Sequence, residues 1–136
     1  MRNLVFTLLL AAAFNAGAGN SPSADGASLY VISPVHGEVV SSPVKVVFGL
    51  SGMGVAPAGT DKANTGHHHL LIDTGLPDLT RPIPADDQHR HFGGGQTEVV
   101  IELAPGEHSL QLLFADYAHT PHNPPLASQP ITIHVR

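Results

Sequence analysis

Apolar and polar side chains alternate with a period of two along four segments of the chain. These segments are residues 44–50, 98–103, 109–114 and 131–135. In the first, Val44, Val46 and Phe48 fall on one face of an extended chain, whereas Lys45 falls on the other. Such alternation is typical of an antiparallel strand that turns one face to the core. Each segment is therefore predicted to be a half-buried strand.

Three further apolar stretches bring the expected number of strands to about seven. They are Leu29–Ile32, Glu38–Val40 and His67–Asp73. The 14 glycines and 12 prolines leave little room for long helices. The pattern favours an all-β fold, a single immunoglobulin-like antiparallel β-sandwich over residues 28–136. A small Greek-key barrel is the main alternative.

Three connections between the expected strands are longer than most loops in compact domains. They are Ser51–Gly66, Thr74–Gln96 and Ala115–Gln129. Long loops of this kind are usually functional or disordered. Together they carry or border every histidine group described below. If they gather at one end of the sandwich, their imidazoles gather there too.

The N-terminus has the features of a secretory signal peptide, residues 1–18. Arg2 supplies a positive charge, Leu4–Phe14 a short apolar region, and Ala16-Gly17-Ala18 a small-residue cleavage site. The apolar region is too short for a comfortable membrane span, and an uncleaved anchor is the alternative. Cleavage would leave a small, polar and flexible leader over residues 19–27. The protein is therefore expected to be periplasmic or otherwise exported, with no stable membrane span after cleavage.

Composition narrows the possible partners. The chain has 6 Lys/Arg and 11 Asp/Glu, and loss of Arg2 with the signal peptide leaves 5 basic residues. A mildly acidic domain is a poor partner for nucleic acid, whose phosphates need a basic surface. The absence of cysteine excludes a disulfide, so the apolar core has to hold the domain together.

Histidine is the most informative residue type in the chain. Eight of the 10 histidines lie between His67 and His122. Neutral imidazole nitrogen is a good ligand for copper, zinc, nickel and iron. In the run His67-His68-His69, an extended chain places the first and third rings on one face, as two adjacent metal ligands. The second ring shares the opposite face with Leu70 and Ile72, which are expected in the core. The alternatives are a solvated strand start, or a buried ring that is hydrogen-bonded to backbone.

A second pair, His89 and His91, repeats the His-x-His spacing. It runs into Phe92 and the glycines of residues 93–95. The glycines allow a sharp turn and a close approach to another element, and Phe92 is expected to anchor the loop to the core. Metal ligation by this pair is the hypothesis, and a mobile glycine-rich loop is the alternative.

A third pair, His119 and His122, lies in a proline-rich loop and hence outside any helix. The prolines restrict the chain and favour preorganised rings. Asp116 is expected either as a carboxylate ligand or as a partner that orients an imidazole. The alternative is a proline-rich surface loop without a site.

The other histidines and the internal methionine are given smaller roles. His108, at a strand start, is expected to be structural, whereas His36 and His134 are expected to be solvated. Met53 is either a soft thioether ligand for copper(I) or, as the favoured interpretation, a core residue.

Four specific sequence blocks match a known pattern, and the resemblance covers nearly the whole mature domain. They are residues 66–73, 91–98, 105–112, and 119–125 with 131–133. They resemble the domain of unknown function 4399 family of small exported bacterial proteins, and the stretch from Ser42 to Gly59 is similar to family members as well. The resemblance implies an exported, single-domain protein and assigns no activity.

The leading hypothesis is an exported, histidine-rich protein that binds a metal ion, copper first and zinc second. The expected ligands are His67, His69, His89, His91, His119 and His122. Its role would be binding, buffering or delivery without turnover, with another exported protein as a second candidate partner. Two alternatives remain. One is a structural or interaction module without metal, and the other is a metal-dependent redox enzyme, which is suggested by analogy of architecture alone. With ordinary pKa values of about 6.5, these rings would gain charge and release metal on mild acidification.

Overall fold

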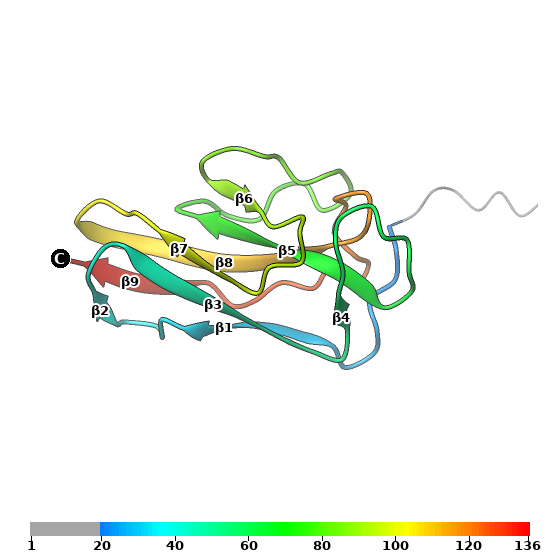
Figure 1. Cartoon of the computed structure of the whole chain (residues 1–136), viewed down its shortest axis with the longest axis horizontal. Helices are drawn as coiled ribbons and strands as arrows, with labels where there is room; N and C mark the ends of the chain where they lie inside the picture. The colour runs from blue at the N-terminus through cyan, green and yellow to red at the C-terminus, as the bar shows by residue number, and fades with distance from the viewer. Residues whose placement is uncertain (1–19) are drawn as a thin grey trace, which may run out of the picture.

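The computed structural model describes residues 20–136, which form nine strands and no helix (Figure 1). The strands are β1 (Ser28–Ser33), β2 (Val39–Val40), β3 (Val44–Ser51), β4 (Gly54–Val55), β5 (Thr65–Ile72), β6 (His89–His91), β7 (Glu98–Ile101), β8 (Gly106–Ala115) and β9 (Ile131–Val135). The predicted signal peptide lies outside the described residues. Within them, no helix has the length and apolar character needed to cross a membrane.

The strands form two sheets, which confirms the all-β sandwich. One sheet has the order β1-β3-β7, and the other has the order β2-β9-β8-β5-β4, with β6 also paired to β5. Most pairs are antiparallel, but β2 runs parallel to β9 and β4 runs parallel to β5. These two short pairs depart from the predicted antiparallel arrangement. Hydrophobic periodicity could not reveal them, because it carries no information on strand direction.

The core lies between the two sheets and is built from the alternating residues. Val46 of β3 and Leu110, Leu112 and Phe114 of β8 have 0% exposure. They share one cluster with Phe48. Complete burial of an apolar side chain of this size contributes roughly 1.5–3 kcal/mol. The predicted inward faces of these strands are confirmed.

The opposite face of β5 and β8 is covered as well. Leu71 and Leu113 are fully buried in a second, smaller cluster with Ile83 and Ala115. Ile83 belongs to the long connection between β5 and β6, and β6 itself lies on the side of β5 away from β1 (Figure 1). β5 is therefore buried on both faces, and this second face is the one that carries the candidate site.

Two short strands, β4 and β6, lie inside segments that were predicted as loops. Both pair with β5, which places Gly54 opposite Thr65 and His91 opposite His69. A strand of two or three residues is too short for a period of two to be recognised. β6 matters for the site because it brings a second histidine-bearing segment alongside β5.

The segment expected to be a flexible leader makes specific hydrogen bonds to two long loops. The side-chain amide of Asn20 donates to the carbonyl oxygens of Leu79 (2.6 Å) and Pro121 (2.8 Å). The backbone N–H of Asn123 donates to the carbonyl oxygen of Ser21 at 2.9 Å. The short polar segment thus satisfies backbone groups of both loops.

Candidate metal centre

The outer face of β5 carries His67 and His69, because alternate residues of a strand share a face. In the register with β8, His67 lies opposite Ala115 and His69 opposite Leu113. Gly66 makes this pairing possible, since a Cβ at that position would collide with the carbonyl oxygen of Ala115. Both rings are thus fixed on a central strand beneath the long loops.

His68 points to the opposite face, as predicted. It is 1% exposed and packs between Phe48 and Phe114, with ring centroids 5.0 Å and 5.1 Å away. Leu70 and Ile72 share its side of the strand and belong to the main core cluster. The ring is therefore part of the core and is separated by the strand from its two neighbours.

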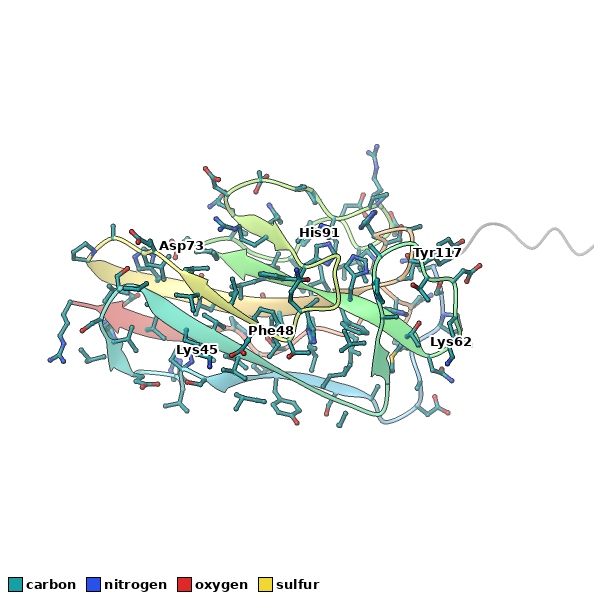
Figure 2. The ribbon with its side chains drawn as sticks, viewed as in Figure 1. Lys45, Phe48, Lys62, Asp73, His91 and Tyr117 are labelled. Atoms are coloured by element: carbon teal, nitrogen blue, oxygen red, sulfur yellow. The ribbon has the colours of Figure 1, made fainter. Side chains whose placement is uncertain are left out.

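β6 supplies His91, which the side-chain view shows next to the loops above the sheet (Figure 2). The next residue, Phe92, is buried and packs on Phe48 with ring centroids 5.0 Å apart, as expected of an anchor. At Gly93, a Cβ would collide with the His91 ring. The glycine run was predicted to allow a close approach to another group, and at Gly93 that group is the His91 ring.

The loop after β8 supplies His119 through a tight turn that Asp116 organises. Oδ1 of Asp116 accepts the backbone N–H groups of Ala118 (2.9 Å) and Thr120 (3.1 Å). Its Oδ2 accepts the hydroxyl of Ser21 at 2.8 Å. His119 has φ 65°, a left-handed conformation that is costly outside glycine and persists only where its surroundings hold it. Of the two roles considered for Asp116, the structure supports the orienting partner.

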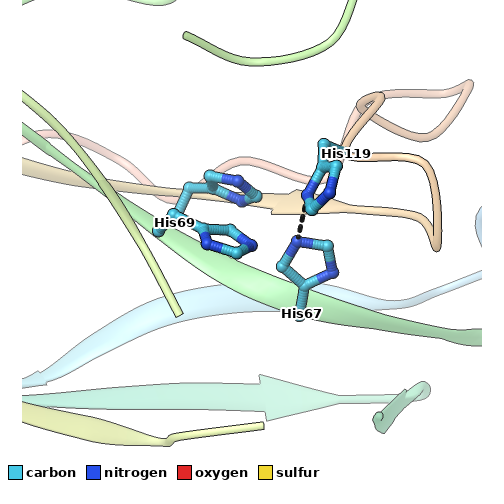
Figure 3. Close-up of side chains that lie close together, drawn as sticks. His67, His69 and His119 are labelled. Atoms are coloured by element: carbon cyan, nitrogen blue, oxygen red, sulfur yellow. Dashed lines mark hydrogen bonds between the residues drawn. The ribbon is translucent and has the colours of Figure 1, made fainter. Parts of the chain in front are cut away.

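Four imidazoles from these three segments converge on one point. They belong to His67, His69, His91 and His119, called the histidine group below, and one ring nitrogen from each lies within 4.8 Å of the others. Nε2 of His67 and Nδ1 of His119 are 3.2 Å apart and hydrogen-bonded, as the dashed line in Figure 3 marks. Two nitrogens bound tetrahedrally at roughly 2.0–2.1 Å from one zinc ion are separated by roughly 3.3 Å. The His67–His119 pair therefore has the spacing of two ligands of one ion, and the other two rings lie near enough for the group to hold a metal.

Two members of the group are buried with unused ring nitrogens. His67 is 0% and His69 1% exposed, and Nδ1 of each has no hydrogen-bond partner. An unpaired buried polar group costs roughly 1–3 kcal/mol, and native structures hold few of them. Met53 packs against the core, so the donor set is imidazole alone. Such a set fits copper or zinc and fits calcium poorly.

Burial keeps these imidazoles uncharged. It lowers the pKa of His67 to about 4 and that of His69 to about 3, and the neighbouring rings act in the same direction. Burial, followed by the charge of His119, also lowers the pKa of His91. A neutral ring offers the lone pair that a metal needs. For these three rings, the gain of charge is therefore expected at a more acidic pH than the sequence predicted, because the prediction used the pKa of a solvated imidazole.

A hollow of about 250 Å³ opens on one side of the histidine group. It is lined by His69, His91 and His119 and by Pro82, Ile83 and Ala85 of the connection between β5 and β6. His67 lies behind these rings and is fully buried. The group is thus closed by β5 on one side and reachable from the hollow on the other.

His89 and His122, the two other expected ligands, lie outside the histidine group. His89 Nδ1 donates to Asp86 Oδ1 at 2.7 Å, and the same oxygen accepts the His89 backbone N–H at 2.9 Å. His122 Nε2 donates to the carbonyl oxygen of Thr65 at 3.2 Å, and its ring stacks on Phe114. Each ring is held by a partner of its own, which spacing along the sequence does not reveal.

The remaining histidines fulfil the smaller roles expected of them. His108 donates through Nδ1 to Asp73 and through Nε2 to the carbonyl oxygen of Ala104, both at 2.7 Å. These two acceptors, Asp73 first, raise the pKa of His108. His36 and His134 are exposed.

Fold and site together define a small all-β protein with four clustered imidazoles that could hold a metal ion. The family model for the domain of unknown function DUF4399 matches residues 46–136. The chain therefore belongs to the DUF4399 family, as its sequence blocks indicated. The matched region includes the whole histidine group. No curated protein and no solved structure matches the chain significantly.

Proposed function

We propose that this protein binds a transition-metal ion through the histidine group and serves to bind, buffer or deliver that ion outside the cytoplasm. The observation that carries the proposal is the convergence of four ring nitrogens, from three separate segments, within 4.8 Å. Copper is the first candidate because copper(II) favours nitrogen ligands and has the highest affinity of the divalent series, and zinc is the second. The signal-like N-terminus supports export.

A purely structural role for the histidines has less support. It would call for dispersed rings, each satisfied by backbone hydrogen bonds. Instead, the ring centroids of His91 lie 5.0 Å from those of His67 and 4.8 Å from those of His119. A redox enzyme would need turnover in addition to a bound metal, whereas binding needs only the group itself.

Titration of the purified, metal-free protein with copper(II) and zinc(II), in competition with a chromophoric chelator, tests the proposal. His91→Ala is the informative variant, because His91 is exposed and its removal leaves the core intact. His89→Ala is the matched control, two positions away on β6 and outside the group. We expect His91→Ala to weaken binding by roughly tenfold or more and His89→Ala to match the wild type. Binding weaker than about millimolar, or equal losses in both variants, would contradict the proposal.

A further inference from the structure

The hollow beside the histidine group has walls of two kinds. Three imidazoles form one wall, and Pro82, Ile83 and Ala85 form the other. None of these lining residues is an aspartate, glutamate, lysine or arginine. A small molecule that enters the hollow therefore meets imidazole rings and hydrocarbon, with no carboxylate, lysine or arginine side chain to pair with.

A divalent ion in the group would carry two positive charges, which the surrounding protein balances only in part. Neutral imidazoles contribute no negative charge. Asp116 accepts hydrogen bonds from Ala118, Thr120 and Ser21, and its single negative charge acts on His67 from outside the histidine group. A charge in a partly buried site is costly unless an opposite charge accompanies it. Because His67 and β5 close the back of the group, the open side for such a charge is the hollow.

We propose that the hollow is a binding site for a small monovalent anion, which coordinates the metal ion beside the four imidazoles. This inference rests on the proposed function and names the additional ligand of the same site. The anion supplies the negative charge that the histidine group lacks, and copper(II) accepts a further ligand in a tetragonal arrangement. The hollow, at about 250 Å³, lies below the range of about 300–1,000 Å³ that is usual for drug-sized ligands. Halides and linear pseudohalides belong to the class that fits.

Azide is a suitable probe, because its coordination to copper(II) produces a charge-transfer absorption band that neither partner has alone. The copper(II)-loaded protein is titrated with azide and followed by absorption and electron paramagnetic resonance, and its copper content is measured after gel filtration. We expect a saturable band and a changed resonance spectrum, with copper retained. A spectrum that azide leaves unchanged, or copper that azide strips from the protein, overturns the inference.

Ala85→Phe tests the position of the anion. Ala85 is exposed, lines the hollow and is not a ligand, so a ring placed there would fill the space that azide needs. We expect azide affinity to fall by roughly tenfold or more while copper affinity stays at the wild-type value. Ala63→Phe, which adds the same ring to an exposed alanine of another loop, should change neither affinity. Undiminished azide affinity in Ala85→Phe overturns the inference.

Two further comparisons keep the outcomes separate. If Ala85→Phe does not fold, Ala85→Leu carries the same expectation with a smaller loss of azide affinity. A protein that binds no copper contradicts the proposed function and this inference together. Copper binding that depends on His91 but yields no azide band contradicts this inference alone.

Discussion

Asp116→Ala is predicted to release His119 without removing any ligand. Asp116 is 5% exposed, and its carboxylate accepts hydrogen bonds from the N–H groups of Ala118 and Thr120 and from the hydroxyl of Ser21. These hydrogen bonds close the turn that holds His119 at φ 65°. A left-handed conformation costs a non-glycine residue roughly 1–3 kcal/mol, so the backbone should relax once the carboxylate is gone. The His119 ring would then leave the histidine group.

The expected magnitudes follow from these contacts. A hydrogen bond to a charged group contributes roughly 1.5–3 kcal/mol, but donors exposed by an opened turn recover part of this from water. We therefore expect the free energy of unfolding to fall by about 2–4 kcal/mol. Removal of a group that orients a metal ligand typically lowers metal affinity by roughly 10–100-fold. We therefore expect Asp116→Ala to bind copper(II) roughly 10–100-fold more weakly than the wild type.

Urea unfolding of the metal-free protein and chelator competition for copper(II) measure the two effects. Asp86→Ala is the matched control, because Asp86 also accepts three hydrogen bonds and orders a turn, yet it presents His89, which lies outside the group. Asp116→Asn removes the charge but keeps an acceptor of similar shape. It should retain more copper affinity than Asp116→Ala if turn geometry is what matters.

Wild-type copper affinity in Asp116→Ala would refute this account, even if the variant were less stable. So would an equal loss of copper affinity in Asp86→Ala, because that would show a general response to a weakened loop. Identical behaviour of the asparagine and alanine variants would assign the effect to the negative charge of Asp116 and not to the turn.

Three further predictions concern stability. The folded-state pKa values of the three consecutive histidines of β5, about 4, 4 and 3, lie below the ordinary value of 6.5, so the unfolded chain binds more protons as pH falls. The contribution of these histidines to the stability of the metal-free protein should therefore be fully present above pH 6.5 and lost as the pH falls toward 4. A thermal unfolding midpoint that does not change with pH in this window would contradict the prediction. Gly66→Ala forces β5 away from the carbonyl oxygen of Ala115 and should lower the free energy of unfolding by about 1–3 kcal/mol. Gly75→Ala, with nothing within 4 Å, is its control, and similar urea midpoints in the two variants would argue against the steric explanation. Asn20→Ala removes two side-chain hydrogen bonds and should lower the free energy of unfolding by about 1 kcal/mol or more. It should also speed amide hydrogen exchange in the loop after β8. Unchanged exchange there would show that the N-terminal segment does not hold that loop.

The strands of the sandwich could be predicted wherever alternation extended over several residues. Val44, Val46 and Phe48 are buried as expected, because the side-chain period of a strand is a local property of the backbone. The cover over the outer face could not be predicted in this way. Leu113 and Ile83 meet across a long connection, and no periodic pattern relates two residues so far apart in the chain.

The candidate site could likewise be predicted only where neighbouring positions of one strand were involved. Residue type and strand spacing were enough to place His67 and His69 on one face with His68 opposite, since only neighbouring positions were involved. The same spacing suggested His89 as strongly as His91. The structure separates them, because a carboxylate three positions earlier binds the ring of His89, while pairing with β5 brings His91 to the group.

The sequence by itself determined an all-β chain whose six expected ligand histidines lie in one strand and two long loops. Tertiary structure alone decided which rings meet. His67 and His119 are 52 positions apart, and their nitrogens are 3.2 Å apart because the loop after β8, in a turn that Asp116 helps to hold, folds back over β5. Strand periodicity describes directions over a few residues, whereas a metal site depends on distances of a few ångströms between segments. Strand register and loop hydrogen bonds set those distances, and both form only in the folded protein.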